Sequence, residues 1–310
     1  QFSKAADPMS PIRSLCLLAL LLATSVAIAQ APAPAPATDT PKAVLVTGAS
    51  TGIGRKITER LAAEGYFVYA GARKDKDLAE LDAIDNVQSV RLDVTRAEDI
   101  AAAVETITQG GRGLYGLVNN AGVAISGPLT ETSEDDFHYL MNVNLYGPYR
   151  ITKAFAPLII ADKGRITTIS SISGILSSPN LGVYSMSKHA MEAFGDALAG
   201  ELAPLGVQVS LIEPGNFNSE IGQTAAKRKG VDSPAADRSK YPEPDAVAEA
   251  ALHALSDENP RHRYMVVPEQ KEAEWTIRKA IQELVQLNQG HAYSYDRAAL
   301  IEMLDAELAK

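Results

Sequence analysis

The regular alternation of short apolar runs with helical segments is the feature that most restricts the fold of this chain. Seven runs rich in β-branched residues are predicted as strands, at residues 43–47, 66–70, 87–92, 114–118, 166–170, 207–212 and 263–267. Helical spacing fills most of the intervals, at residues 55–64, 97–108, 134–160, 185–202 and 245–255. Strands that are joined through helices run parallel, and unbroken apolar runs indicate burial on both faces. The sequence therefore predicts an α/β fold, a doubly wound parallel seven-stranded sheet with helices on both faces.

The charge and the cysteine content of the chain disfavour several classes of protein. Its 38 acidic and 29 basic side chains give a formal net charge of −9. A protein that binds nucleic acid irrespective of sequence needs a basic surface, so no nucleic-acid partner is expected. The only cysteine, Cys16, precedes the predicted domain, and the five histidines show no metal-ligand spacing. Disulfides, thiolate catalysis and a metal site are therefore not expected in the domain.

Three segments precede the predicted domain. Residues 1–8 stand before a methionine and resemble a cloning remnant. Residues 9–29 have the charged, apolar and small-residue order of a secretory signal peptide, and residues 30–41 form an Ala/Pro linker. We expect a periplasmic or otherwise exported protein. The alternatives are an uncleaved leader that tethers the protein to a membrane, and a cytoplasmic location.

The domain itself is predicted to span residues 42–268, and residues 269–310 form a C-terminal helical extension. Ile277 and Ile281 begin an apolar stripe at helical spacing, and either Ser294 or Asp296 is placed to cap a last helix. The stripe predicts that the extension packs on the domain or on a partner subunit.

A glycine-rich turn joins the first strand to the first helix. Gly48, Gly52 and Gly54 lie in the sequence TGASTGIG, which directly follows the strand. Glycines at this place let backbone N–H groups approach a pyrophosphate, and the helix N-terminus adds partial positive charge. The spacing departs from GxGxxG, so the position of the turn between strand and helix carries the prediction. It indicates a dinucleotide-binding site.

The end of the second strand bears on which dinucleotide is bound. An acid about 20 residues past the glycines would bind the ribose 2′-hydroxyl of NAD. This chain instead reads Ala-Gly-Ala-Arg-Lys over residues 70–74. Because Arg73 can make a two-pronged contact with a 2′-phosphate, the sequence favours NADP(H). Asp75 is close enough to keep NAD(H) open as the alternative.

A tyrosine and a lysine one helical turn apart form a candidate catalytic pair. Tyr184 and Lys188 stand at i and i+4 on one helix. A phenol has a pKa of about 10, and a neighbouring ammonium would lower it toward the range of a useful base. Ser171 follows the fifth strand and residues 119–122 follow the fourth, so both belong to the carboxyl edge of the sheet, where ligands bind. Asn144 lies within the long helix, where its amide is expected to bind water.

Taken in this order, the motifs resemble those of the short-chain dehydrogenase/reductase family in its single-domain form, with a weak similarity to retinol- and hydroxysteroid-type members. The resemblance implies a Rossmann fold and four catalytic residues, Asn144, Ser171, Tyr184 and Lys188. It implies cofactor contacts from Gly48, Ser50, Gly52, Ile53, Gly54, Arg73, Asp93, Val94, Asn120, Ala121, Gly122, Tyr184, Lys188, Pro214, Gly215, Phe217 and Ser219.

The resemblance also implies roles for these residues. Tyr184 would exchange a proton with the substrate oxygen, and Ser171 would stabilise that oxygen. Lys188 would lower the pKa of Tyr184 and bind the nicotinamide ribose, while Asn144 would anchor a water in a proton relay. The expected substrate is a small apolar secondary alcohol or carbonyl compound, enclosed by residues 177–183 and a lid over residues 216–241. A homodimer or homotetramer is expected.

Two other functions stay open at this point. One is a cofactor-binding sensor or scaffold without turnover, and the other is a related dehydratase or epimerase.

Overall fold

The computed structural model describes residues 40–221 and 238–309. The predicted cloning remnant and signal peptide lie outside the described residues, as do most of the predicted linker and the middle of the predicted lid. Within the described part of the chain, no helix combines the length and the hydropathy that a membrane span requires.

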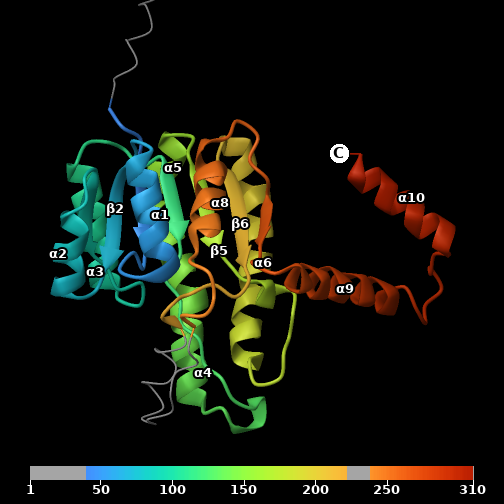
Figure 1. The fold of residues 1–310 in the computed structure, drawn as a ribbon. Helices are drawn as coiled ribbons and strands as arrows, with labels where there is room; N and C mark the ends of the chain where they lie inside the picture. Colours follow the sequence, from blue (N-terminus) through green and yellow to red (C-terminus); the bar gives the residue numbers. More distant parts are fainter. Residues whose placement is uncertain (1–39, 222–237, 310) are drawn as a thin grey trace, which may run out of the picture. The chain divides into compact units, whose positions relative to one another are not determined.

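Seven parallel strands form one sheet in the order β3-β2-β1-β4-β5-β6-β7 (Figure 1). The sheet order turns back between β1 and β4, and ligands of such sheets bind where the order reverses, at the carboxyl ends of the strands. The predicted doubly wound fold is confirmed. The strands are β1 Ala43–Thr47, β2 Phe67–Ala72, β3 Val87–Arg91, β4 Gly116–Asn119, β5 Arg165–Ile169, β6 Gln208–Pro214 and β7 Arg263–Val266.

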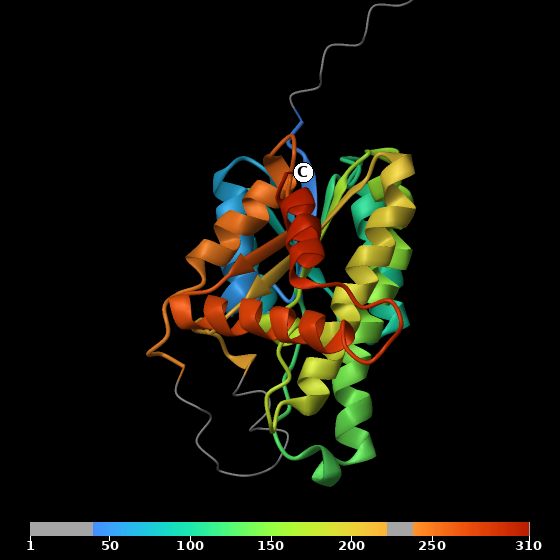
Figure 2. The same cartoon turned by 90° about the vertical axis from the view of Figure 1, so that its right-hand side faces the viewer.

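Helices cover both faces of the sheet because successive strand residues point to opposite sides. In β1, Val44 and Val46 belong to the core beneath α1 and α8, whereas Leu45 belongs to the core beneath α3, α5 and α6. Figure 2 shows the sheet between these two layers. The helices are α1 Gly52–Ala63, α2 Asp75–Asp82, α3 Ala97–Gln109, α4 Glu134–Met141, α5 Gly147–Ala161, α6 Gly182–Leu202, α8 Asp245–Ser256, α9 Gln270–Leu287 and α10 Arg297–Leu308.

Two elements differ from the sequence-based expectation. Helix α2 was not predicted. Only Leu81 of its eight residues is buried, so its sequence lacks the recurring apolar residues by which a helix is recognised. The single helix expected over residues 134–160 is interrupted by a π-helical segment, η2 Asn142–Tyr146, between α4 and α5. Such wide turns occur often at functional sites, and this one contains Asn144.

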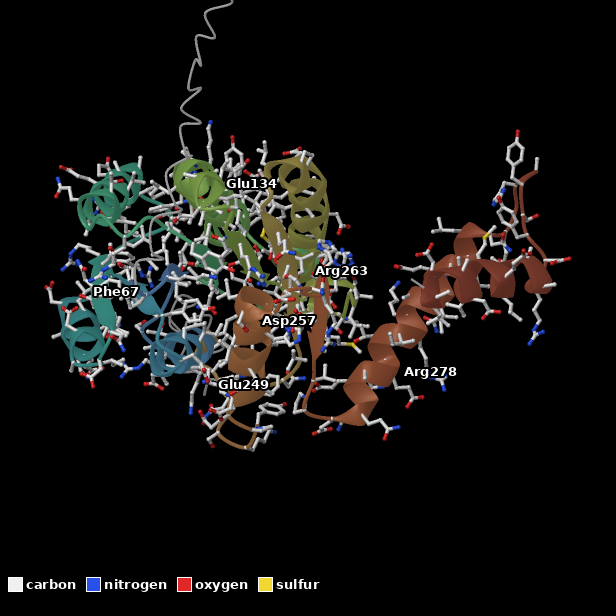
Figure 3. The ribbon with its side chains drawn as sticks, turned by 90° about the horizontal axis from the view of Figure 1, so that it is seen from above. Phe67, Glu134, Glu249, Asp257, Arg263 and Arg278 are labelled. Carbon is white, nitrogen blue, oxygen red and sulfur yellow. The ribbon has the colours of Figure 1, made fainter. Side chains whose placement is uncertain are left out.

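The buried residues of the C-terminal extension, as far as the structure describes it, lie near its start. Glu272 and Thr276 of α9 are buried, whereas Ile277 and Ile281, which begin the predicted apolar stripe, are 52% and 53% exposed. Figure 3 shows the side chains of α9 and α10 beyond β7. The Asp296 side chain accepts a hydrogen bond from the Ala299 N–H at 2.9 Å and caps α10. Burial of the stripe by a partner subunit stays a prediction.

Candidate active site

The glycine turn between β1 and α1 is shaped to admit a ligand close to its backbone. Gly48 and Gly52 have φ angles of +66° and +55°, which L side chains rarely adopt. A Cβ on Gly54 would lie 2.2 Å from the Gly48 carbonyl oxygen. Thr51, the N-cap of α1, makes no side-chain cap, so no side chain competes for the first N–H groups of the helix. The cradle therefore fits the phosphates of a dinucleotide.

Asn120 and Thr47 hold this turn in place. The Asn120 side-chain amide donates to the carbonyl oxygens of Thr47 and Gly48 at 2.9 and 3.0 Å. The Thr47 hydroxyl in turn accepts from the backbone N–H groups of Asn120 and Ala121 at 3.0 and 3.1 Å. The side-chain amide of Asn120, which was predicted to contact the cofactor, thus holds the glycine turn through these hydrogen bonds.

The segment after β6 approaches the glycine turn from the other side. A Cβ on Gly52 would lie 3.4 Å from the Ser219 Cβ, so the two predicted cofactor contacts are neighbours. Gly215 donates its N–H to the Val266 carbonyl at 2.8 Å, and the Phe217 side chain is buried in the core. These contacts anchor the segment beside the space that a cofactor would occupy.

The remaining predicted cofactor contacts lie along the same edge of the sheet. Ala121 lies close to Gly48, since a Cβ on Gly48 would be 2.9 Å from the Ala121 Cα. Val94 is buried against Gly147, and Ile53 packs at the margin of the core under α1. Ser50 is half-buried in the turn itself. A Cβ on Gly122 would lie 3.5 Å from the Asn144 Oδ1, which links this edge to the π-helical segment.

Charged groups gather where β2 and β3 end. Arg73 lies 3.7 Å from the Asp93 carboxylate, and Arg91 donates to the Arg73 carbonyl oxygen at 2.7 Å and to the Asp75 carboxylate. Burial would raise the pKa of Asp93, but hydrogen bonds from Thr95 and the nearby charge of Arg73 lower it below its usual value. Asp75, the acid that kept NAD(H) open, is therefore already engaged by a cation.

Sequence reasoning missed Arg91, although a signal for it was present. The parallel register pairs Ala72 with Arg91, so this side chain stands beside the end of β2. A parallel alignment of the two predicted strands would have placed it next to Arg73.

Ser171 and Tyr184 meet at the carboxyl end of β5. The Ser171 hydroxyl is close enough to the Tyr184 phenol to lower the pKa of that phenol. The Ser171 hydroxyl also lies 3.4 Å from the Pro214 carbonyl oxygen and accepts from the Ser173 N–H at 3.1 Å. Lys188 is buried, donates to the Ile169 carbonyl at 2.8 Å, and lies with its Nζ 5.7 Å from the centre of the Tyr184 ring. The structure thus brings three of the four predicted catalytic residues together.

The pKa of Tyr184 is determined mainly by burial in this structure. Burial raises the pKa of Tyr184 above its ordinary value, and the hydrogen bond from Ser171 and the charge of Arg238 offset this only in part. Burial also lowers the pKa of Lys188 to about 8. Burial thus outweighs the groups that lower the pKa of Tyr184, while the Lys188 ammonium donates to the backbone of Ile169. A lowering of the Tyr184 pKa by Lys188 stays a prediction.

Asn144, the fourth predicted catalytic residue, is occupied by protein partners. Its amide N–H groups donate to the Val123 carbonyl at 2.8 Å and to the Ser187 hydroxyl at 3.1 Å, and its Oδ1 accepts from the Val123 N–H at 2.8 Å. An amide offers two donors and two acceptor lone pairs, so one lone pair is left for a water. The side chain mainly ties the π-helical segment to α6 and to the chain after β4.

Arg238 reaches the site from the far end of the predicted lid and was not anticipated. Its guanidinium donates to the Phe217 carbonyl at 3.0 and 3.2 Å, and its charge acts on the Tyr184 phenol. No local spacing in the sequence signals this contact, because it joins segments that are distant along the chain.

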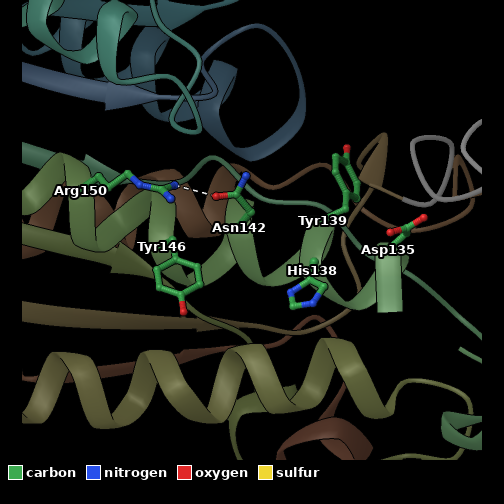
Figure 4. Close-up of a pocket in the computed structure, with 6 residues that line it drawn as sticks. All are labelled: Asp135, His138, Tyr139, Asn142, Tyr146 and Arg150. Atoms are coloured by element: carbon green, nitrogen blue, oxygen red, sulfur yellow. Dashed lines mark hydrogen bonds between the residues drawn. The ribbon is translucent and has the colours of Figure 1, made fainter. Parts of the chain in front are cut away.

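A surface hollow lies apart from these residues, along α4, η2 and α5 (Figure 4). None of its six lining residues was predicted as a site residue, and Arg150 and Asn142 are hydrogen-bonded to each other at 2.7 Å across it. We assign it no part in the active site. The lining residues are Asp135, His138, Tyr139, Asn142, Tyr146 and Arg150.

A carboxylate pair is buried next to the site. Glu192 of α6 and Glu213 of β6 both contact the Arg263 guanidinium, at 3.1 and 3.3 Å. Burial and the facing Glu192 carboxylate raise the pKa of Glu213 to about 7, and Arg263 offsets this only in part. One guanidinium therefore does not neutralise both carboxylates.

This pair predicts a pH dependence of folding. Because the pKa of Glu213 is raised in the folded state, folding favours the protonated side chain. This contribution to the free energy of unfolding is complete at pH values below the unfolded-state pKa of Glu213, and it is lost as the pH rises through about 7. Glu213→Gln should remove this loss and make the protein more stable than wild type at pH 8, on the order of 1–3 kcal/mol, with little gain at pH 5. Urea unfolding at both pH values measures the difference. Glu98→Gln, on a side chain that is 79% exposed, is the control, and an equal effect there would contradict the account.

Comparisons with known proteins agree with this architecture. The family model for short chain dehydrogenases matches residues 42–230. The mitochondrial D-beta-hydroxybutyrate dehydrogenase of Mus musculus is 35% identical over 260 residues, which cover 72% of this chain and 76% of that protein. A short-chain dehydrogenase structure from Streptomyces avermitilis aligns with a TM-score of 0.69 at 30% identity, over 83% of this chain and all of that one. The structure of ElxO with NADP bound aligns with a TM-score of 0.64 at 26% identity, over 73% of this chain and 97% of that chain.

The family match covers more than half of the chain, and the mouse relative covers more than two thirds of it. The chain belongs to the short-chain dehydrogenase/reductase family and is an oxidoreductase built on a Rossmann fold.

Proposed function

We propose that the protein is an NADP(H)-dependent oxidoreductase that interconverts a secondary alcohol and a carbonyl compound, with Tyr184 as the general acid and base. The observation that carries this proposal is the arrangement of the Ser171 hydroxyl and the Tyr184 phenol, which act on each other at the carboxyl edge of the sheet. It presents two hydroxyl groups to one substrate oxygen. A bound nicotinamide would supply or accept the hydride at the adjacent carbon.

The protonation state of Tyr184 favours carbonyl reduction. Since burial raises the pKa of the phenol, Tyr184 is protonated at neutral pH and ready to donate to a substrate oxygen that gains negative charge. Ser171 can donate to the same oxygen. Lys188, with a pKa of about 8, carries the nearest positive charge on α6 and stabilises the phenolate that remains after donation.

The preference for NADP(H) rests on the charges at the ends of β2 and β3. Arg73 is more than half exposed, and Lys74 and Arg91 lie beside it. Asp75 pairs with Arg91, which offsets its negative charge beside Arg73. A 2′-phosphate would meet an excess of cations here, and the solved relative ElxO binds NADP.

Removing the Arg73 guanidinium should therefore change the cofactor preference. We expect Arg73→Ala to raise the KM for NADPH by roughly 10- to 100-fold, since a hydrogen bond to a charged group contributes about 1.5–3 kcal/mol, and to leave the KM for NADH within about threefold. Steady-state kinetics with both cofactors measures this. The control is Lys76→Ala, in the same region but 83% exposed and paired with Glu80. An equal loss with NADH would contradict the assignment of Arg73 to the phosphate.

An apolar side chain near the start of α6 supports a small apolar substrate. Leu129 is 56% exposed and packs so closely on Gly182 that a Cβ on Gly182 would lie 2.5 Å from Leu129. Gly182 begins α6 and stands two residues before Tyr184.

A panel of ketones and their secondary alcohols tests the proposed function. The full chain with NADPH should lose the absorbance of the reduced nicotinamide when a ketone is added. A cofactor-binding sensor would bind NADPH and leave it reduced, while a dehydratase or epimerase would change its substrate without net consumption of NADPH. Either result would overturn the proposal.

Export by a signal peptide over residues 9–29 is a separate proposal, supported by the order of charged, apolar and small residues. The N-terminal residue of the protein from its native source tests it. A mature chain that begins near residue 30 is expected, and a chain that retains the leader would contradict export with cleavage.

A further inference from the structure

Glu272 is the residue through which the C-terminal extension holds the chain after β6. Its side chain lies in the first turn of α9 and is 3% exposed. One carboxylate oxygen accepts from the Asn216 side-chain amide at 2.7 Å, and the other accepts from the Asn216 backbone N–H at 3.2 Å. A Cβ on Gly215 would lie 2.0 Å from this carboxylate, so the contact also needs the glycine.

The carboxylate is kept in this buried place by neutral donors. Both hydrogen-bond partners of Glu272 are groups of Asn216 without a charge, and burial of a carboxylate costs free energy that such bonds offset. The turn that carries it is itself fixed, because the Thr276 hydroxyl donates to the Glu272 carbonyl at 2.8 Å and the Glu272 N–H donates to the Glu269 carbonyl at 3.0 Å. The Glu272 carboxylate and Asn216 therefore form a buried, hydrogen-bonded contact and not a surface ion pair, and we call this contact the clamp.

The clamp acts on the segment that lies over the candidate cofactor site. Asn216 directly follows Gly215 and precedes Ser219, which stands against Gly52 of the glycine turn. On its other side, Arg238 binds the Phe217 carbonyl. Residues 215–219 are thus held from two directions, by α9 and by the end of the predicted lid.

We propose that Glu272 is a positioning residue that holds residues 215–219 over the dinucleotide, so that helix α9 sets the affinity for the cofactor. This inference rests on the proposed function for the identity of the ligand. Without the carboxylate, the half-buried Asn216 N–H and amide lose their acceptor, and the segment opens more often. The rate of hydride transfer should change little, because Glu272 contacts neither Ser171 nor Tyr184.

The first test measures cofactor binding directly. In the full chain, Glu272→Ala should raise the Kd for NADPH, followed by its own fluorescence, by roughly tenfold, with kcat within about twofold of wild type. Glu272→Gln keeps an acceptor oxygen for Asn216 and should recover part of the affinity. The control is Glu274→Ala on the same helix, an exposed acid that pairs with Arg278. Wild-type affinity in Glu272→Ala, or an equal loss in Glu274→Ala, would overturn the proposal.

The second test needs no cofactor and separates the two proposals. Amide hydrogen exchange of residues 215–219 in the ligand-free chain should be roughly tenfold faster in Glu272→Ala and unchanged in Glu274→Ala. Unchanged exchange in Glu272→Ala overturns the clamp itself. A wild-type chain that does not bind NADPH instead overturns the proposed function, and with it the ligand that the clamp would serve.

Discussion

Tyr184→Phe is expected to lower kcat for carbonyl reduction by about 10³-fold and to leave the Kd for NADPH unchanged. The substitution removes only the hydroxyl group, and general acid–base catalysis by a placed side chain contributes roughly 10²–10⁴-fold. The phenol acts on the Ser171 hydroxyl, and the other predicted cofactor contacts are unchanged by the substitution. Steady-state kinetics together with an NADPH binding titration measures both quantities. The fold should persist, because the ring that packs against the core is retained.

A second tyrosine provides the matched control for this experiment. Tyr66 is also partly buried with a raised pKa, and its hydroxyl lies 3.4 Å from the Leu255 carbonyl, within the core beneath α1 and α8. Tyr66→Phe should leave kcat within about twofold of wild type. Activity of Tyr184→Phe within about threefold of wild type would contradict the assignment of the proton donor to Tyr184.

Gly54→Ala should damage both cofactor binding and stability. The added methyl group would lie 2.2 Å from the Gly48 carbonyl oxygen and 2.3 Å from the Asn120 amide nitrogen, so the backbone of the turn has to move. Overpacking of this kind costs about 1–3 kcal/mol of folding stability. Because a displacement of about 1 Å can cost 10²-fold at a reacting site, we expect the Kd for NADPH to rise by at least roughly tenfold. Urea unfolding and an NADPH titration measure the two effects.

Gly200→Ala isolates the effect of the crowded turn. Gly200 also lies within a helix, α6, but a Cβ there has no neighbour within 4 Å. Alanine in an open helical position should stabilise the protein by about 0.5–1 kcal/mol and leave NADPH binding unchanged. A Gly54→Ala protein that binds NADPH as well as Gly200→Ala does would contradict the account of the cradle.

The sheet could be predicted from the sequence because its strands are buried on both faces. The bounds of β1 coincide with the predicted run over residues 43–47, and the ends of the other strands differ by few residues. Helix α2 escaped prediction because most of its residues face solvent and leave little apolar period. The π-helical turn at residues 142–146 was invisible because helical spacing continues on either side of it.

The sequence predicted those residues of the candidate site that follow a strand or stand at a fixed spacing along a helix. The rule that ligands gather at the carboxyl ends of parallel strands indicated that Ser171 and Tyr184 lie together, and the structure brings them into contact. The pKa of Tyr184 is raised mainly by burial, which the i, i+4 spacing of Tyr184 and Lys188 does not encode. Arg238 and Glu272 reach the site by contacts between distant segments, which one sequence does not reveal.

The central claim is that this chain transfers a hydride between NADPH and a carbonyl carbon while Tyr184 supplies the proton. Reduction of a ketone with NADPH that carries deuterium at the transferred position of nicotinamide C4 tests it most directly. The account predicts an alcohol with one deuterium on the carbinol carbon from the wild-type chain, and almost none from Tyr184→Phe although that variant still binds NADPH. A product without deuterium on that carbon, or NADPH that is bound but never consumed with any ketone of the panel, would contradict it.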